Sequence, residues 1–293
     1  MKKLVPNKRY LIRHHRGFSR RVGPLLQEAH HDKVVAVAYP PDSSEVFATA
    51  AADGTIRVWD VNTCTVLSTG ACQTKITGEP LCLDFTGEVS FSGWGDGQIP
   101  AFEAEHGEQL WAIDNAHRGG CTAIVASHNR KFLVSGGEQG EVRVWEIRTR
   151  EMVVNLKQHT SPVTDLKLYP DDSHVYSSSR DRTILLWDLR AEARQTSMTQ
   201  RMGGINAIDM LPGTTSLVSV GQEKLVSMWD NRESSPLVTT GAPPGAPPMG
   251  EQFCIALTVP YDKPELALIA TGGAGDCRVR LWRYHQGPAL IAM

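Results

Sequence analysis

The residues of this chain that could perform chemistry are ten histidines, six cysteines and one glycine-rich loop. A structural zinc site needs Cys or His ligands at short, regular spacings. The cysteines form no CxxC pair; they are Cys64, Cys72, Cys82, Cys121, Cys254 and Cys277. The tandem pairs His14-His15 and His30-His31 would point to opposite faces of a strand, so neither pair can chelate one ion. We therefore expect no metal centre and interpret the cysteines as reduced thiols of an intracellular protein.

Three common catalytic or phosphate-binding motifs are also absent from the sequence: the GxSxG elbow, the HExxH zinc pair and the GxxxxGK[ST] phosphate loop. The loop Gly93-Trp94-Gly95-Asp96-Gly97 resembles a phosphate-binding loop, but such a loop must open a helix, and no helical periodicity follows it. A turn between strands explains it better. Since nothing places a nucleophile beside a base, we expect a protein that is not an enzyme, with no cofactor and no small-molecule substrate.

The elements that would position these residues are repeated along the chain. Residues 131–146 predict two strands around a tight turn, because apolar β-branched residues flank Gly136, Gly137 and Gly140. In five segments a Ser or Thr precedes a closing aromatic residue by ten positions: Thr49 and Trp59, Ser92 and Phe102, Ser135 and Trp145, Ser177 and Trp187, Ser219 and Trp229. The aromatic residues follow at intervals of 43, 43, 42 and 42, and Trp282 comes 53 later. This period is typical of a WD-repeat β-propeller with four strands per blade.

The repeat predicts an all-β propeller of six complete four-stranded blades preceded by an N-terminal half-blade. The expected blades are about 30–69, 72–115, 117–156, 159–199, 200–240 and 250–293, with a Pro/Gly-rich loop at 241–250. Residues 1–29 hold two candidate strands, Lys8 to His14 and Pro24 to Glu28, in the register of the last two strands of a blade. Six blades could close on these strands. We favour a seven-fold ring with an incomplete seventh blade, because these residues can fill about half a blade.

The formal net charge of −2 hides an asymmetry between the N-terminus and the rest of the chain. Residues 1–27 carry eight basic residues and no acid, which leaves 22 basic against 32 acidic residues elsewhere. The body is therefore not expected to bind nucleic acid. The basic segment fits a solvated strand edge, an arm that docks on an acidic partner or, despite Pro6 and Pro24, a mitochondrial transit peptide. No apolar run approaches the roughly 20 residues of a membrane span, so no membrane insertion is expected.

In the WD-repeat family, which the chain resembles, a buried polar relay joins a His before the first strand, a Ser or Thr in the second, an Asp in the next turn and the closing Trp. The matching residues are His159, Ser177, Asp181 and Trp187 in blade four; His30 or His31, Thr49, Asp53 and Trp59 in blade one; and His117, Ser135 and Trp145 in blade three. In blade three Gln139 takes the place of the Asp. Burial of an indole N–H and an imidazole requires such partners. Blades two, five and six lack part of the relay, so we expect them to be less firmly held.

A closer resemblance is carried by residues 92–102, 115–124 and 135–145, which are similar to the second propeller of the cilia- and flagella-associated protein 52 family. They share Phe102 in place of the usual Trp. That family has two tandem propellers and lines the lumen of ciliary doublet microtubules. The resemblance covers about residues 30–190. It implies a structural scaffold of the axoneme or centriole, in the cytoplasm and cytoskeleton, that binds tubulin and neighbouring axonemal proteins.

The resemblance also indicates where partners would bind, because loops before the first strands and turns that carry the Asp share one face of a WD propeller. Arg118, Arg180, Arg201 and Trp94 are expected to ring that face, and the 241–250 loop is expected to overhang it. Arginines bind carboxylates in bidentate fashion, which suits an acidic tubulin surface. The alternative is that these arginines lie in ordinary solvent-exposed turns and bind no partner. Trp94 fits either an exposed anchor or a side chain packed between blades.

A different functional class is suggested by the segments Trp187 to Arg190 and Trp229 to Arg232. They resemble the WDxR motif of substrate receptors for cullin–RING ubiquitin ligases, in which the arginine meets the ligase adaptor. By that resemblance Arg190 and Arg232 would bind the adaptor. The alternatives are that arginine simply follows Trp-Asp at a strand end, and that the protein is a general WD-repeat scaffold.

Overall fold

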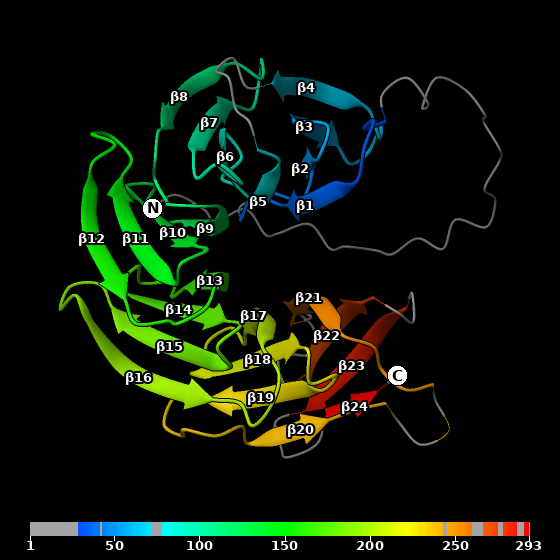
Figure 1. Cartoon of the computed structure of the whole chain (residues 1–293). Helices are drawn as coiled ribbons and strands as arrows, with labels where there is room; N and C mark the ends of the chain where they lie inside the picture. The colour runs from blue at the N-terminus through cyan, green and yellow to red at the C-terminus, as the bar shows by residue number, and fades with distance from the viewer. Residues whose placement is uncertain are drawn as a thin grey trace, which may run out of the picture.

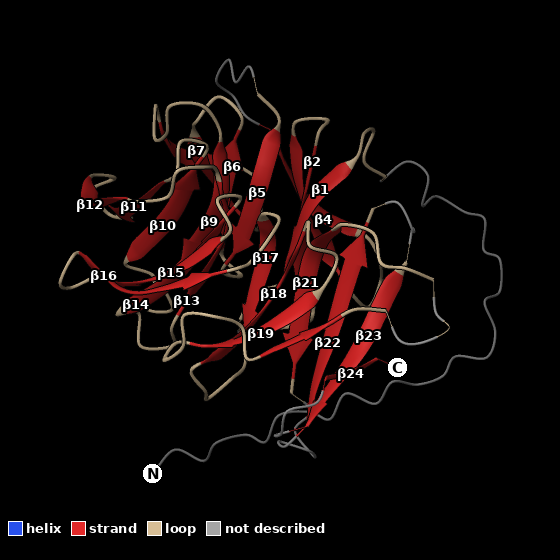
Figure 2. Cartoon of the chain, turned by 60° about the horizontal axis from the view of Figure 1, so that its bottom comes forward, coloured by secondary structure: helices blue, strands red, loops and turns tan. Residues whose placement is uncertain are grey.

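The computed structural model describes residues 29–41, 43–71, 78–242, 245, 247–259, 266–274, 278–285 and 290–292. Its regular elements are 24 strands, arranged as six antiparallel four-stranded sheets around a centre (Figure 1). Figure 2 shows strands and loops without a helix in this part of the chain. The prediction of an all-β propeller with six complete blades is therefore confirmed. The predicted half-blade at the N-terminus lies outside the described residues.

The first three blades follow one another along the chain. Blade 1 contains β1 (Val34–Ala38), β2 (Val46–Ala51), β3 (Thr55–Asp60) and β4 (Val66–Ala71). Blade 2 contains β5 (Pro80–Phe85), β6 (Val89–Trp94), β7 (Ile99–Glu103) and β8 (Gln109–Ile113). Blade 3 contains β9 (Cys121–Ala126), β10 (Phe132–Gly137), β11 (Glu141–Glu146) and β12 (Met152–Lys157).

The other three blades repeat the same order. Blade 4 contains β13 (Val163–Leu168), β14 (His174–Ser179), β15 (Thr183–Asp188) and β16 (Ala193–Thr199). Blade 5 contains β17 (Ile205–Met210), β18 (Ser216–Gly221), β19 (Val226–Asp230) and β20 (Val238–Thr240). Blade 6 contains β21 (Gln252–Thr258), β22 (Leu266–Gly273), β23 (Val279–His285) and β24 (Leu290–Ala292).

The position of a strand within its blade explains its residue pattern. Second and third strands such as β14 and β15 are covered on both faces by neighbouring blades and are almost continuously buried. The outer strand β12 is exposed at every second residue, which is the pattern of a sheet edge with one face in solvent. The core therefore lies between the blades; one cluster joins Val134 and Val144 of blade 3 to Leu166 of blade 4.

The first strands of consecutive blades pack side by side around the centre, from β1 against β5 to β17 against β21. Half-buried carboxylates link several of these neighbours. Asp84 accepts the N–H of Ala126 in the next blade at 2.6 Å, and Asp165 likewise accepts the N–H of Ile208 at 3.0 Å. Each bond ties one blade to the next through a backbone amide, so the inner strands hold the blades in register.

Candidate partner-binding site

The side chains of the predicted relay are in contact in blade 4. His159 places Nδ1 2.9 Å from Asp181 Oδ2 and Nε2 2.7 Å from Ser177 Oγ. The Trp187 indole N–H donates to the same hydroxyl at 2.8 Å. Because a carboxylate only accepts, Nδ1 carries the imidazole proton and Nε2 accepts from the Ser177 hydroxyl. Every polar group of the relay therefore has a partner.

This Ser, His and Asp arrangement has the connectivity of a hydrolase triad, but its position excludes that chemistry. Ser177 has no exposed surface, and the Trp187 ring lies across it as a hydrogen-bond donor. No substrate carbonyl can reach a hydroxyl buried in this way. The relay holds the blade together and is not an active site.

Blade 1 repeats the arrangement with His30, whose Nε2 lies 2.7 Å from Thr49 Oγ1 and whose Nδ1 lies 3.1 Å from Asp53 Oδ2. Of the two histidines considered there, His30 occupies the relay; His31 contributes only its backbone N–H, which donates to Asp53. Trp59 donates its indole N–H to Thr49 at 2.8 Å.

Blade 3 completes the relay with a carboxylate that the sequence did not indicate. Glu141, the first residue of β11, places Oε1 2.9 Å from His117 Nδ1, and Nε2 of His117 lies 2.7 Å from Ser135 Oγ. Trp145 donates to Ser135 at 2.8 Å. Gln139 stands at the usual Asp position, but Glu141 supplies the charge from two residues further along.

In blade 2 a different side chain donates to the relay hydroxyl, because Phe102 cannot donate a hydrogen bond. The indole N–H of Trp94 donates to Ser92 Oγ at 2.9 Å, and the Trp94 side chain is only 2% exposed. Of the two alternatives for Trp94, the structure shows the packed side chain, so the expectation of an exposed anchor is wrong. Because Trp94 is buried, its side chain cannot contact a partner alongside the exposed arginines.

Blades 5 and 6 keep the last bond of the relay. Trp229 donates to Ser219 at 2.8 Å and Trp282 to Thr271 at 3.1 Å. In blade 5 the buried Gln200 donates to the carbonyl of Met202 at 2.9 Å, while the neighbouring Arg201 is exposed. Asp276 of blade 6 lies outside the described residues.

Burial and hydrogen bonding set the ionisation of the relay groups. Desolvation lowers the pKa of His30 and of His117, although a carboxylate beside each ring acts in the opposite direction. Burial alone would raise the pKa of Asp181, but hydrogen bonds from His159, Thr183 and the Thr160 backbone outweigh it and lower that pKa. The fold therefore favours the neutral imidazole at His30 and His117 and the ionised carboxylate at Asp181.

The loops that precede the first strands and the turns between second and third strands carry the relay histidines and Asp53 and Asp181; we call this side of the ring the relay face. Arg180 and Arg182 flank Asp181 in the β14–β15 turn, and Arg201 lies in the loop before β17. The Arg182 guanidinium donates to the Arg201 carbonyl at 3.5 Å, so these two segments are adjacent.

An exposed methionine follows Arg201 in the same loop. Met202 is 69% exposed, and Arg180, Arg182 and Arg201 are exposed with it. We call these four residues the arginine patch. Arg118 is also exposed and occupies the corresponding loop of blade 3, so the three predicted arginines lie on one face of the ring.

The Pro/Gly-rich loop between β20 and β21 reaches the same face and is fastened at its end. Met249 is buried against Met228 and Trp282 in the core between blades 5 and 6. The Arg280 guanidinium donates to the carbonyl of Pro247 at 3.3 Å. The C-terminal part of the loop is therefore anchored in the described structure.

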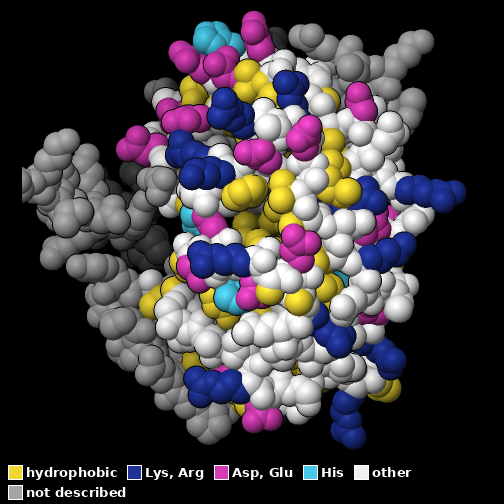
Figure 3. Space-filling model, turned by 90° about the vertical axis from the view of Figure 1, so that its left-hand side faces the viewer, with side chains coloured by type: hydrophobic (Ala, Val, Ile, Leu, Met, Phe, Trp, Pro, Cys, Tyr) yellow, Lys and Arg dark blue, Asp and Glu magenta, His cyan; other side chains and the backbone are white. Residues whose placement is uncertain are grey.

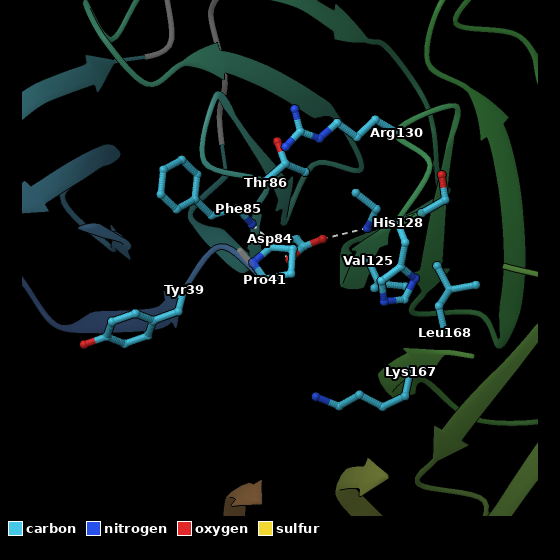
Figure 4. Close-up of a pocket in the computed structure, with 12 residues that line it drawn as sticks. Tyr39, Pro41, Asp84, Phe85, Thr86, Val125, His128, Arg130, Lys167 and Leu168 are labelled. Atoms are coloured by element: carbon cyan, nitrogen blue, oxygen red, sulfur yellow. Dashed lines mark hydrogen bonds between the residues drawn. The ribbon is translucent and has the colours of Figure 1, made fainter. Parts of the chain in front are cut away.

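The opposite face of the ring holds a cavity of about 280 Å³ near the centre. Figure 4 shows Asp84, His128 and Lys167 around it, with Tyr39 on the side of blade 1. Burial raises the pKa of Asp84, and that carboxylate is already engaged by the Ala126 amide. Its partners show that it holds two blades together.

Arg190 and Arg232, predicted for adaptor binding, lie in the turns that follow β15 and β19, on the same side as this cavity. Both are exposed, and Arg232 lies 3.7 Å from the carboxylate of its neighbour Asp230. The structure thus separates the two sets of candidate arginines onto opposite faces.

One side of the outer rim carries charges of both signs (Figure 3). Figure 3 views the side of β12 and β16, where hydrophobic side chains lie among acidic and basic groups. In the described part of the chain no helix is long and apolar enough to cross a membrane, and no group of three or more His, Cys, Asp or Glu side chains could hold a metal ion.

Comparison with known proteins finds the family model "WD domain, G-beta repeat" at residues 23–60, 108–146 and 150–188. The chain is 34% identical over 168 residues to human cilia- and flagella-associated protein 52. This aligned region covers 55% of this chain and 26% of that protein. The protein of the same name from Chlamydomonas reinhardtii is 34% identical over 167 residues, covering 56% and 26%. Mouse pre-mRNA-processing factor 19 is 30% identical over 143 residues, covering 47% and 27%. The matched part thus spans about a quarter of each relative, and the resemblance expected from the sequence is confirmed.

Proposed function

Because the chain is a WD-repeat β-propeller similar to cilia- and flagella-associated protein 52, we propose that it is a non-catalytic scaffold of the cilium or flagellum. In this proposal it binds the microtubule lattice and neighbouring axonemal proteins. The similarity to relatives from a mammal and from an alga supports the location. In the described part of the chain, the Ser177 and His159 side chains of the relay are buried, which supports a structural role for this set.

The observation that carries the microtubule part of the proposal is the arginine patch. Arg180, Arg182 and Arg201 are exposed cations on adjacent segments, and Met202 offers an apolar contact beside them. Guanidinium groups bind carboxylates with two hydrogen bonds, and an interface gains most where such groups surround an apolar contact. The patch therefore suits an acidic protein surface such as that of tubulin.

The patch would act at short range, because charges are screened beyond about 8 Å at physiological ionic strength. Long-range attraction would draw the propeller to the lattice at low salt, while the loops of the relay face would determine its register. Binding should therefore weaken with salt but not vanish at physiological concentration.

Co-sedimentation with purified microtubules tests this proposal. Replacing Arg180, Arg182 and Arg201 together by alanine should weaken binding by about tenfold or more, which corresponds to a loss of about 1.4 kcal/mol or more. The matched control replaces Arg190 and Arg232, which lie on the opposite face. Equal loss in both variants would indicate unspecific charge attraction, and unchanged binding of the triple variant at low salt would remove the relay face from the proposal.

A further inference from the structure

Two free thiols meet where the innermost strands of blades 2 and 3 lie side by side. Cys82 is in β5 and Cys121 begins β9, and Figure 1 shows these two strands next to each other near the centre of the ring. The Cys82 thiol donates to the backbone carbonyl of Cys121 at 3.4 Å. The pair therefore spans the junction between two blades that are consecutive in the chain.

Gly93 of β6 bounds the separation of the two sulfur atoms. A Cβ placed on this glycine would lie 2.5 Å from Cys82 Sγ and 2.6 Å from Cys121 Sγ, so the two sulfurs are no more than about 5 Å apart. A disulfide holds its sulfurs about 2 Å apart, so rotation about the side-chain bonds has about 3 Å or less to close. Because any side chain at position 93 would push between the sulfurs, the glycine keeps the pair together.

The equivalent junction between blades 3 and 4 is packed without sulfur. A Cβ at Gly136 would meet Val163 of β13 and Ala123 of β9. These two residues hold the register of Cys121 and Cys82. Valine and alanine fill the same space there, so the packing of a blade junction does not require thiols. The two cysteines between blades 2 and 3 are therefore not explained by packing alone.

The two thiols differ in exposure and in ionisation. Cys82 is half-buried, whereas Cys121 has no exposed surface. The hydrogen bond with the Cys82 thiol, followed by burial, raises the pKa of the Cys121 thiol well above its ordinary value. Cys121 therefore keeps its proton near neutral pH, and Cys82 is the thiol that a dissolved oxidant can meet.

We propose that Cys82 and Cys121 form a redox site, separate from the scaffold role, that a hydroperoxide oxidises to a disulfide between blades 2 and 3. In the first step the Cys82 sulfur attacks one peroxide oxygen and becomes a sulfenic acid. The O–O bond breaks, and the other oxygen leaves with the Cys82 proton as an alcohol or water. In the second step the Cys121 sulfur attacks the Cys82 sulfur, the S–O bond breaks, and the hydroxyl leaves with the Cys121 proton as water. The two thiols lose two electrons, which reduce the peroxide.

The disulfide would add a covalent link between the first strands of two blades. Asp84 already joins the same strands by a hydrogen bond from the Ala126 amide. The link from Cys82 to Cys121 closes a loop that contains the other three strands of blade 2, and it restricts the unfolded chain. Oxidation should therefore raise the urea concentration at the unfolding midpoint, and reduction by a dithiol should reverse this change.

Exposure of the reduced, folded 293-residue chain to hydrogen peroxide tests the proposal. Free thiols are then blocked with N-ethylmaleimide, and the chain is digested without reduction. Trypsin cleaves after Arg118, so the two cysteines fall in different peptides, and mass spectrometry detects their link. The Cys82–Cys121 link should be at least about tenfold more abundant than any other cysteine pair, because proximity raises the effective concentration of the two thiols. The exposed Cys64 and Cys254 are internal controls.

Two variants assign the roles of the thiols. Cys121→Val and Cys82→Ala copy the residues of the junction between blades 3 and 4, so folding should be retained, with circular dichroism as the check. In Cys121→Val the sulfenic acid at position 82 has no thiol to condense with, and dimedone should trap it at least about tenfold more than in the unaltered chain. In Cys82→Ala, Cys121 should stay reduced while the exposed Cys64 is oxidised. Peroxide should leave the urea midpoint of both variants unchanged.

Three results would overturn the proposal. The first is oxidation of the exposed Cys64 in the folded chain without a link between Cys82 and Cys121. The second is a link that forms only in urea, which would show that native packing keeps the sulfurs apart. The third is dimedone labelling of Cys121 in Cys82→Ala that equals the labelling of Cys82 in Cys121→Val, since the buried thiol would then be the one that meets the oxidant.

Discussion

The indole of Trp94 donates a 2.9 Å hydrogen bond to the hydroxyl of Ser92, only two residues before it. In four other blades the same hydroxyl position is bonded by a Trp ten residues later, as Trp187 is to Ser177. Blade 2 has Phe102 at that later place and keeps the bond by moving its donor to the end of β6. The bond is thus retained although the residue that makes it has changed.

Replacement of Trp94 by phenylalanine should therefore destabilise the protein by about 1–3 kcal/mol, because it leaves the buried Ser92 hydroxyl without its donor. Ser92→Ala removes the acceptor instead. In a double-mutant cycle the two changes should cost less together than the sum of their separate effects. Denaturant unfolding measures all three variants, and strict additivity would show that the bond contributes nothing.

A second prediction concerns pH. Burial holds the pKa of His117 below its ordinary value of 6.5, so near and below that value the unfolded chain binds protons that the folded chain does not. The folding stability that depends on a neutral His117 is therefore fully present above pH 6.5. It is lost as the pH falls from that value through the lower pKa of His117 in the folded protein. The urea concentration at the unfolding midpoint should decrease as the pH is lowered from 7.5 to 5.5. In the His117→Asn variant this midpoint should depend less on pH.

His106 is the control for this experiment. It is exposed, and the nearby Glu103 raises its pKa, so its contribution has the opposite sign and is lost as the pH rises. His106→Asn should leave the acid-side decline in place. A decline that is unchanged by His117→Asn would contradict the role assigned to the buried ring.

A third prediction compares two methionines. Met249→Ala should cost about 2–5 kcal/mol of folding stability, because its side chain fills the core between blades 5 and 6. Met202→Ala, at an exposed position, should leave the melting temperature unchanged and weaken microtubule binding instead. Equal losses of stability in both variants would show that the loop is not anchored by Met249.

The repeat could be predicted from the sequence because its signal is periodic, whereas the relay partners depend on side-chain direction. The spacing of Ser177 and Trp187 indicates a hairpin wherever it occurs. Glu141 gave no such signal, since a strand residue replaced the turn Asp. Residues two apart in a strand share a face, so Ser92 and Trp94 did carry a detectable relationship. Met249 lies in a Pro/Gly-rich run with no pattern that indicates burial.

A fourth prediction separates the scaffold from a ubiquitin-ligase receptor. Arg190 and Arg232 occupy equivalent turns on the face opposite the arginine patch. For a scaffold, affinity purification of the intact chain should recover tubulin and no cullin adaptor. Recovery of an adaptor that is lost with Arg190→Ala and Arg232→Ala would favour the receptor instead.

The most direct measurement of the central claim is the location of the tagged 293-residue chain in a ciliated cell, followed by salt extraction of isolated axonemes. The account predicts signal along the axoneme and retention of the protein after the salt wash, because shape-matched loops should hold it when charge attraction is screened. A variant in which Arg180, Arg182 and Arg201 are replaced by alanine should be released more easily. Diffuse signal of the intact chain, with none retained on washed axonemes, would contradict the ciliary role.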